Sequence, residues 1–486
     1  MFSMTWARVL MTCAVVALCA TPALAQKGRQ TPGSWEKLVS NLERDDFIVT
    51  TGDPIKFDPI GKYCEPGTRY PNALYANYGA PYTAAALKPS PRVLAGLPDE
   101  VGDVVGELPI FRLAPDEAVI LVGLTPPPEA YFSYQVYLAT RKFPGEERPT
   151  LLLNSLGDTV NLQTINTIGP EPFESPMVFI FTADQGVEAR IRAALRRAGY
   201  PGSIVNTIVV PSATLKMGFE LGSDTFLVAN RNALWANKNA GKAYVENPTF
   251  RVARVTPMVE ATFDPFPAPP LRVRGTGQTE IDLTPTLARL HDAILEHYQG
   301  YKAIEYITKT VAYEGYDFTE RQVTTLGDTR DALYLGAGDL PEFGLTDKMT
   351  LKEGEFLIAY GLNHMATGKA TYVNLNMYTS GPSKMALGSA FPVDLAGSAY
   401  QFLSGPDAEI TYAYKISRNC AGEDFCLTLA VPIEGCKNKD DGTEILTDTS
   451  PLGVIFRLYL EPPTSIGAAF PEVVYDKVIK FTLTGQ

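Results

Sequence analysis

Residues 264–270, with the sequence DPFPAPP, constrain the fold of this chain more than any other segment. Proline fixes φ and lacks a backbone N–H, so a proline-dense stretch is extended and semi-rigid and cannot join the middle of a sheet. The pattern of apolar residues changes later, beyond Leu351, to short runs of β character. The boundaries that follow are 26–262 for an N-terminal α/β or α+β domain, 263–283 for a proline-rich linker, 284–350 for a helical connector and 351–486 for a C-terminal β-rich domain.

The N-terminal domain contains a strand–helix–strand pattern at residues 177–211. Residues 177–181 (MVFIF) form a continuous apolar run typical of a buried strand, and Asp184 is a suitable helix cap. Apolar side chains then recur at helical spacing up to Gly199, and residues 204–210 form a second apolar run. Apolar strands on both sides of a helix predict an α/β or α+β layer.

The C-terminal side begins with a predicted long helix and continues with short strands. Thr284 and Pro285 are typical of a helix start, and the helical reading extends to about Val311. Beyond Leu351 the apolar runs are short and separated by Gly, Pro, Asn and Asp, which favours a sandwich or small barrel. The predicted fold class is therefore α+β, with an N-terminal α/β-type layer region followed by a long helix and a C-terminal β-sandwich-like domain.

Residues 1–25 have the three-part pattern of a signal peptide. Arg8 supplies a positive charge, residues 9–20 form an apolar core, and Ala23-Leu24-Ala25 matches the small-x-small cleavage pattern. The apolar core is shorter than the roughly 20 residues that span a bilayer, and no later segment reaches that length. We therefore expect export to the periplasm or the extracellular space, with no transmembrane segment in the mature chain.

Four of the six cysteines lie beyond the predicted signal peptide, and they permit three pairings. Cys420 and Cys426 lie close together between two strand-like runs, which favours a local disulfide bond. Cys64 and Cys436 would then tie the two ends of the chain together. Zinc is the competing interpretation, but an oxidising compartment favours disulfide bonds and Cys-x5-Cys is not a usual finger spacing. We therefore predict two disulfide bonds and no metal site.

Composition and motifs exclude several classes of function. With 486 residues, 45% of them hydrophobic and 20% charged, the chain is globular and long enough to bury a large core. A formal net charge of −12 argues against nucleic acid as the main partner. The sequence has no Walker motif, and the glycine pairs at 275–277 and 336–338 lack the third glycine of a dinucleotide-binding loop. We predict no cofactor, and the oligomeric state stays open.

His364 is the histidine best placed for chemistry, because residues 361–369 form a polar loop between two strand candidates. The loop predicts a catalytic pair, with His364 as base or hydrogen-bond donor and Lys369 as an anion contact. An ordinary polar hairpin is the alternative. His291 and His297 lie about 120° apart around the predicted helix, so they cannot bind one metal ion together without distortion.

An aromatic segment at residues 125–137 follows a buried-strand pattern directly. Prolines end that strand, and Tyr131, Tyr134 and Tyr137 come soon after. Aromatic faces stack well on sugars and other rings, so these three tyrosines are predicted to bind substrate. The alternative is an aromatic corner of the core.

Residues 327–339 gather Asp328, Asp331 and Asp339 with Arg330 in a short span. Paired carboxylates can perform acid–base or glycosidic chemistry when their separation is suitable. A salt-bridged turn with helix caps explains the same residues, and sequence does not give their separation.

Together these patterns predict an exported soluble protein. Its size and export favour an extracytoplasmic enzyme, a hydrolase or lyase acting on a small organic or saccharide substrate. The alternative is a non-catalytic secreted protein that binds a ligand or interacts with the cell envelope. Catalysis itself therefore stays undecided at the level of sequence.

Overall fold

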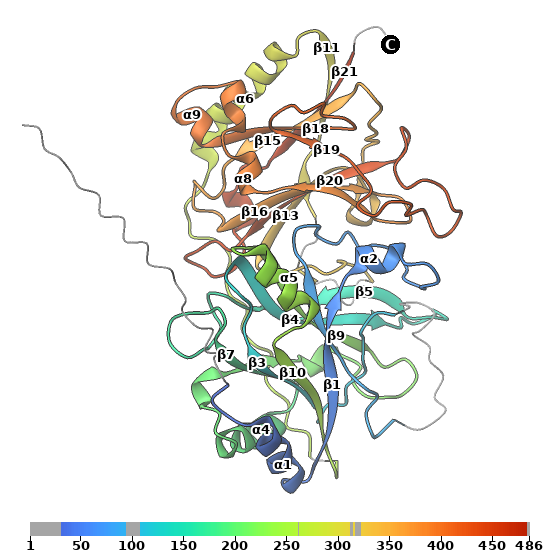
Figure 1. The fold of residues 1–486 in the computed structure, drawn as a ribbon, viewed down its shortest axis with the longest axis vertical. Coiled ribbons are helices and arrows are strands. Elements are labelled where there is room, and N and C mark those ends of the chain that lie inside the picture. The colour runs from blue at the N-terminus through green and yellow to red at the C-terminus, as the bar shows by residue number, and fades with distance from the viewer. Residues whose placement is uncertain (1–30, 94–106, 261, 312–313, 316–321, 484–486) are drawn as a thin grey trace, which may run out of the picture.

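The computed structural model describes residues 31–93, 107–260, 262–311, 314–315 and 322–483. The fold is mostly β, with 34% of residues in strands and 19% in helices. In the described part of the chain the strands form sheets of ten, five and six strands, and the helices are short (Figure 1). The predicted α+β class with a long helix is therefore wrong. The predicted signal peptide at residues 1–25 lies outside the described residues.

The N-terminal half is built around the ten-stranded sheet. Its strands are β1 (Phe47–Phe57), β2 (Tyr82–Ala86), β3 (Ala118–Leu124), β4 (Glu129–Arg141), β5 (Thr150–Ser155), β6 (Val160–Asn161), β7 (Pro176–Thr182), β8 (Val205–Val209), β9 (Thr225–Trp235) and β10 (Phe250–Pro257). They follow the order β5-β4-β9-β2-β1-β10-β3-β7-β8, and β6 pairs with β4. Residues 47–52 of β1 pair with β10, and residues 53–57 pair with β2. β1 therefore links the strands on one side of the sheet, from β10 to β8, to those on the other side, from β2 to β5.

The strand–helix–strand unit at residues 177–211 is present but does not define the fold. β7 leads into α4 (Gln185–Arg197), where the Asp184 side chain accepts a hydrogen bond from the Val187 amide at 2.7 Å. β8 then lies parallel to β7, whereas the other described neighbours in this sheet are antiparallel. One crossover on an antiparallel sheet is not an α/β layer, which is why the sequence pattern misled.

The N-terminal half carries its other helices at the sheet faces and edges. They are α1 (Trp35–Arg44), α2 (Pro59–Cys64) and α5 (Lys238–Glu246), with the 3-10 turns η1 (Gly202–Ile204) and η2 (Ser212–Thr214). α1 and α4 pack Leu38, Leu42, Ile191 and Leu195 against the apolar face of β3, β7 and β10. Amphipathic spacing in both helices thus covers one side of the sheet.

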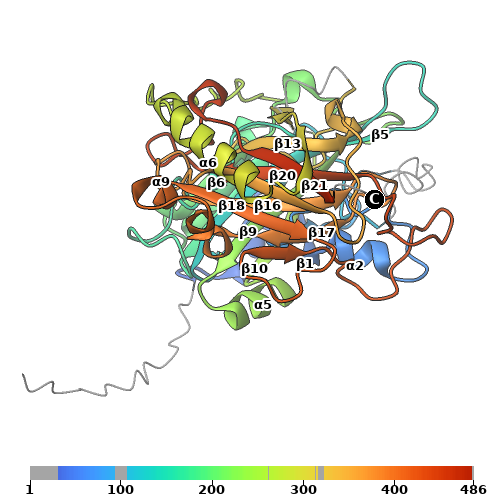
Figure 2. The same cartoon turned by 90° about the horizontal axis from the view of Figure 1, so that it is seen from above.

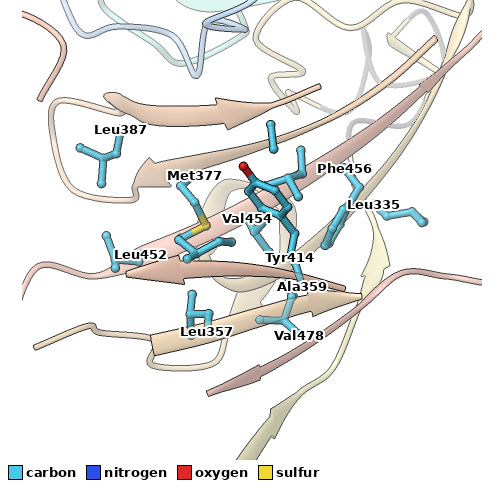
Figure 3. Packing of buried hydrophobic residues seen from close by; sticks show 14 of the residues in the cluster. Leu335, Leu357, Ala359, Met377, Leu387, Tyr414, Leu452, Val454, Phe456 and Val478 are labelled. Carbon is cyan, nitrogen blue, oxygen red and sulfur yellow. The ribbon is translucent and has the colours of Figure 1, made fainter. Parts of the chain in front are cut away.

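The C-terminal half contains two sheets packed face to face. The five-stranded sheet is β11 (Tyr301–Tyr306), β21 (Lys477–Leu483), β15 (Phe356–Leu362), β18 (Thr411–Ser417) and β19 (Cys426–Thr428) in that order. The six-stranded sheet contains β12 (Lys309–Thr310), β13 (Ala332–Leu340), β14 (Leu345–Thr346), β16 (Tyr372–Thr379), β17 (Ala386–Ala390) and β20 (Leu452–Tyr459). Figure 3 shows the core between them, with Met377 and Val454 on one sheet and Leu357 and Val478 on the other.

The helix predicted from Thr284 to about Val311 is much shorter. α6 (Thr284–His297) has 14 residues, and β11 and β12 follow it. Residues 301–311, YKAIEYITKTV, are rich in aromatic and β-branched side chains, which fit a strand better than a helix. Every residue of β11 pairs with β21, from far along the chain. A local pattern of apolar residues cannot predict a pairing partner so far along the chain.

The remaining short helices lie around the C-terminal sheets. They are α8 (Pro392–Leu395), α9 (Pro406–Glu409), η3 (Ile281–Leu283), η4 (Pro341–Phe343), η5 (Ser398–Gln401) and η6 (Phe470–Glu472). Residues 266–280, which connect the halves, contain neither helix nor strand.

Two disulfide bonds join Cys64 to Cys436 and Cys420 to Cys426, which confirms the predicted pairing. The first bond links α2 in the N-terminal half to a loop of the C-terminal half across 372 residues of sequence. Among the described residues, no helix combines the length and the apolar character needed to cross a membrane.

The outer face of the six-stranded sheet packs on the N-terminal sheet. Tyr131 of β4 and Ala233 of β9 contact a cluster that includes Tyr334, Tyr372 and Tyr459 from β13, β16 and β20. The rings of Tyr131 and Tyr459 lie 4.6 Å apart. The view along the long axis places β13, β16 and β20 in front of β9 and β10 (Figure 2). The six-stranded sheet is therefore the central layer, with one face toward each neighbouring sheet.

Candidate functional site

A cavity of about 410 Å³ lies between the two sheets of the C-terminal half. Most of its wall area is apolar, with Leu362 of β15, Val373 and Leu375 of β16 and Leu458 of β20, and polar side chains such as Asn374 and Arg457 complete it. α8 and η5 border it through residues such as Leu395 and Tyr400. We name this space the inter-sheet cavity. Apolar cavities of this size with a few convergent polar groups are the usual form of a small-molecule site.

His364 lines the inter-sheet cavity at the end of β15. The loop of residues 361–369 holds it there, because the His364 carbonyl accepts hydrogen bonds from the amides of Lys369 and Ala370 at 2.8 and 3.0 Å. The imidazole is buried. Its Nδ1 lies 2.8 Å from Glu280 Oε1 and its Nε2 lies 3.3 Å from Asp476 Oδ2.

The two carboxylates determine the charge of His364. Burial disfavours the charged imidazolium, but the adjacent carboxylates of Asp476 and Glu280 outweigh it and raise the pKa of His364 to about 10. Burial raises the pKa of Glu280, and the His364 charge and its hydrogen bonds lower that pKa by more. At neutral pH His364 is therefore an imidazolium that donates from both ring nitrogens. It has no lone pair left to accept a proton.

His364, Glu280 and Asp476 form a charged triad, and both of its carboxylates are fully hydrogen-bonded. Tyr412 donates its phenol to Asp476 Oδ1 at 2.6 Å, and the Val474 amide donates to Glu280 Oε2 at 2.9 Å. The Thr367 hydroxyl donates to Glu280 Oε1. Two carboxylates and one imidazolium leave one negative charge in the wall. A buried cluster with every group paired holds a fixed geometry.

Lys369 shares the loop with His364 but points to a different place. Its ammonium is buried and lies 2.7 Å from Glu461, 2.6 Å from Glu472 and 3.3 Å from the Thr276 hydroxyl. Burial lowers the pKa of Lys369, and the two carboxylates raise it by more. All three N–H donors are therefore used inside the protein. Lys369 joins the connecting segment to the C-terminal half and does not line the inter-sheet cavity.

The three tyrosines of β4 are buried on both faces of that strand. Tyr134 packs 4.4 Å from Phe179 in the N-terminal core, and its hydroxyl lies 3.3 Å from that of Tyr244. Tyr131 and Tyr137 face the other side, because side chains alternate along a strand. None of the three lines the inter-sheet cavity. Their placement matches the aromatic-core alternative rather than an exposed stacking surface.

The carboxylates at residues 327–339 lie apart from His364. Asp331 is buried and accepts hydrogen bonds from Tyr131, Thr159 and Asn161. Burial raises the pKa of Asp331 despite these donors and the nearby Arg272. The structure thus joins this segment to the β4 tyrosines and leaves both separate from the inter-sheet cavity.

Sequence reasoning missed Glu280, Asp476 and Tyr412, the partners that define the environment of His364. They lie 84, 112 and 48 residues from it along the chain. Only the topology brings them together, since Asp476 precedes β21 and Tyr412 lies on β18, and both strands pair with β15. Among the described residues, no group of three or more His, Cys, Asp or Glu side chains is arranged to hold a metal ion.

Comparison with known proteins gives no function. No family model matches the chain, and no curated protein matches it. Among solved structures, an uncharacterized protein from Burkholderia cenocepacia is 10% identical with a TM-score of 0.36, covering 91% of this chain and 86% of its own. A protein from Vibrio parahaemolyticus is 11% identical with a TM-score of 0.37, covering 84% of this chain and 90% of its own. Similarity at this level carries no argument, so function rests on the residues.

Proposed function

We propose that this protein binds a small, largely apolar organic molecule in the inter-sheet cavity and that it does so outside the cytoplasm. The observation that carries the proposal is the cavity itself, about 410 Å³ of space between two packed sheets. The space is bordered by the exposed side chains of Tyr400 and Met365, so it is a pocket open to solvent that a ligand can enter. Its largely apolar wall favours an apolar body over a saccharide, which needs many hydrogen-bonding partners.

The charged triad specifies the polar end of the ligand. Asp476 lines the cavity, and each of its oxygens keeps a second lone pair after the bonds from Tyr412 and His364. Glu409 adds a second carboxylate to the lining, which also includes Arg457. These groups suit a ligand that donates hydrogen bonds, such as an amine or an alcohol.

Binding fits the geometry better than catalysis by His364. A general base needs a pKa near the working pH and a free lone pair. The imidazole of His364 has a pKa of about 10 and both nitrogens occupied. An enzyme would therefore need a base other than His364. For this reason hydrolase or lyase activity is the second candidate, after ligand binding.

The extracytoplasmic location belongs to the same proposal. Residues 1–25 have the pattern of an export signal, and the two disulfide bonds are compatible with an oxidising compartment. Periplasmic and secreted proteins both meet these conditions.

The test uses N-phenyl-1-naphthylamine, an apolar aromatic amine whose fluorescence rises on leaving water. We expect saturable binding to the wild-type protein, weakened at least about tenfold in Val373→Phe, a change of about 1.4 kcal/mol, because the added ring fills the cavity. Val209→Phe is the matched control, since Val209 lines a separate cavity of about 310 Å³ in the N-terminal half.

Equal binding in Val373→Phe and wild type would refute the proposed site, and loss of binding only in Val209→Phe would move it to the other cavity. Turnover of a bound compound that His364→Gln abolishes without loss of binding would favour the enzyme alternative.

A further inference from the structure

Two arginines are buried between the halves of the molecule with no carboxylate partner among the described residues. Arg231 lies on β9 and Arg457 on the outer face of β20, and they are 6% and 5% exposed. Neither forms an ion pair with a described carboxylate. By contrast, buried Arg141 lies 2.6 Å from Asp224 and buried Arg254 lies 2.7 Å from Glu117. Burying an unpaired charge is costly, so this pair differs from the ordinary buried arginines of the same protein.

The hydrogen-bond partners of the two arginines are neutral. Arg231 donates to the Gly327 carbonyl at 2.6 Å, to the Tyr137 hydroxyl at 3.1 Å and to the Tyr459 hydroxyl at 3.4 Å. Arg457 donates to the Tyr75 carbonyl at 3.3 Å. Carbonyl and phenol oxygens satisfy single donors but do not cancel two positive charges.

Several donors around these arginines have no hydrogen-bond partner in the part of the chain that the structure describes. They are Nε of Arg231, Nε and Nη1 of Arg457 and the hydroxyl of Tyr334. Tyr334 lies on β13 next to β20, and the Arg457 guanidinium lies 5.7 Å from the centre of its ring. Burial raises the pKa of Tyr334, so its hydroxyl is a neutral donor. Unpaired buried donors are rare in folded proteins and point to a missing acceptor.

The two arginines and Tyr334 line a cavity of about 40 Å³, together with Tyr82 and Asp328. A water molecule needs roughly 10–15 Å³ of such space, so the cavity holds about three waters or one small anion. Asp328 accepts its hydrogen bonds from other residues and none from the two arginines. Its Oδ1 accepts from the Ser155 amide and the Thr325 hydroxyl, and its Oδ2 accepts from the Ser155 hydroxyl and the Gly315 amide.

We propose that this cavity binds one tetrahedral oxyanion, phosphate or sulfate, between Arg231, Arg457 and Tyr334. Four unpartnered donors from three side chains suit an anion with four oxygens, and arginine is the usual residue for such recognition. The anion joins β9 of the N-terminal sheet to β13 and β20 of the C-terminal half. Arg457 also borders the inter-sheet cavity, whereas Arg231 and Tyr334 line the anion cavity and not the inter-sheet cavity.

The first experiment measures the anion on the full-length purified protein. The protein is prepared without phosphate or sulfate and unfolded, and released anions are measured by ion chromatography. The same preparation is titrated with inorganic phosphate and with sulfate by calorimetry at constant ionic strength. We expect bound and titratable anion to sum to about one per chain, as one cavity predicts. No released anion and no saturable heat would overturn the proposal, and equal affinity for acetate would overturn the tetrahedral assignment.

The second experiment uses variants that separate a loss of phosphate affinity from a loss of folding. Tyr334→Phe removes a hydroxyl that has no partner in the protein, so folding should be unaffected and phosphate affinity should fall about tenfold. Tyr306→Phe, which alters a buried tyrosine of β11, is the control and should keep wild-type affinity. Arg457→Met should reduce affinity about a hundredfold. Wild-type affinity in Tyr334→Phe would overturn the site even if Arg457→Met does not fold.

Discussion

His364 and Arg457 are both buried cations of the C-terminal half, 2% and 5% exposed. His364 lies between Glu280 and Asp476, and each oxygen of those carboxylates accepts at least one hydrogen bond. Among the residues with described positions, Arg457 has no carboxylate partner, and two of its nitrogens have no hydrogen-bond partner. Both cations are removed from water on folding. Carboxylates of the protein compensate the charge of His364, whereas no described carboxylate compensates the charge of Arg457.

The difference separates a structural role from a binding role. A buried cation with complete internal compensation is stable without any ligand, and its proton is held firmly. A buried cation with unused donors is stabilised by whatever anion can enter. We therefore expect His364 to shape the wall of the inter-sheet cavity, and Arg457 with Arg231 to hold a charged ligand. Each region predicts a different response when one group is removed.

Glu280→Ala should have the largest effect on stability, because it removes one carboxylate partner of the His364 imidazolium and leaves the buried imidazole in place. Breaking a buried ion pair from one side costs about 3–5 kcal/mol. We expect the free energy of unfolding in urea to fall by that amount. Thr367 and the Val474 amide would lose their acceptor at the same time.

Glu296→Ala on the exposed face of α6 is the matched control for this loss. A surface change of this kind stays within about 0.5 kcal/mol of wild type. A loss below about 1 kcal/mol in Glu280→Ala would contradict the compensated triad and would make His364 neutral in the folded state.

The pH dependence of stability tests the same triad without breaking it. The pKa of His364 rises from 6.5 to about 10 on folding, so the folded state binds the proton more tightly. This contribution is complete below pH 6.5 and is lost as the pH rises through 10. Glu280 acts in the opposite direction: its lowered pKa gives stability above 4.5 that is lost on acidification.

Between pH 6.5 and about pH 9 the His364 contribution should fall by about 3 kcal/mol, at about 1.36 kcal/mol for each pH unit. The check is the urea unfolding free energy of the wild type and of His364→Gln at both pH values. The difference between the two proteins isolates this residue, since the other titrating groups are shared. Parallel pH profiles in the two proteins would rule out a charged His364.

Local patterns predicted part of the fold and failed where pairing partners are distant. Asp184 as a helix cap and the disulfide between Cys420 and Cys426 depend on neighbouring residues, and the structure contains both. The helix expected from Thr284 to Val311 ends at His297, because β11 pairs with β21. Such a partner overrides a weak helical pattern.

The candidate site could be predicted from the sequence only in part, again because some of its residues are distant along the chain. A polar loop correctly places His364 between two strands, but its partners come from a segment before α6 and from a residue before β21. The buried arginines carry no local signal either. Arg231 and Arg457 lie within apolar strand patterns, and their lack of an acidic partner is visible only when distant strands are brought together.

The smallest expected effect compares two tyrosine hydroxyls, one in each region. Tyr412→Phe removes the donor to Asp476 Oδ1 and leaves a buried carboxylate oxygen unsatisfied, which costs about 1–3 kcal/mol. Tyr334→Phe removes a hydroxyl without a partner, so in an anion-free buffer its stability should equal the wild type or exceed it slightly. Urea unfolding of both variants in chloride gives the contrast directly, and adding phosphate should then stabilise wild type more than Tyr334→Phe. Equal losses in the two variants without phosphate would mean that the Tyr334 hydroxyl is already satisfied, and the distinction between a closed and an open charge cluster would fail.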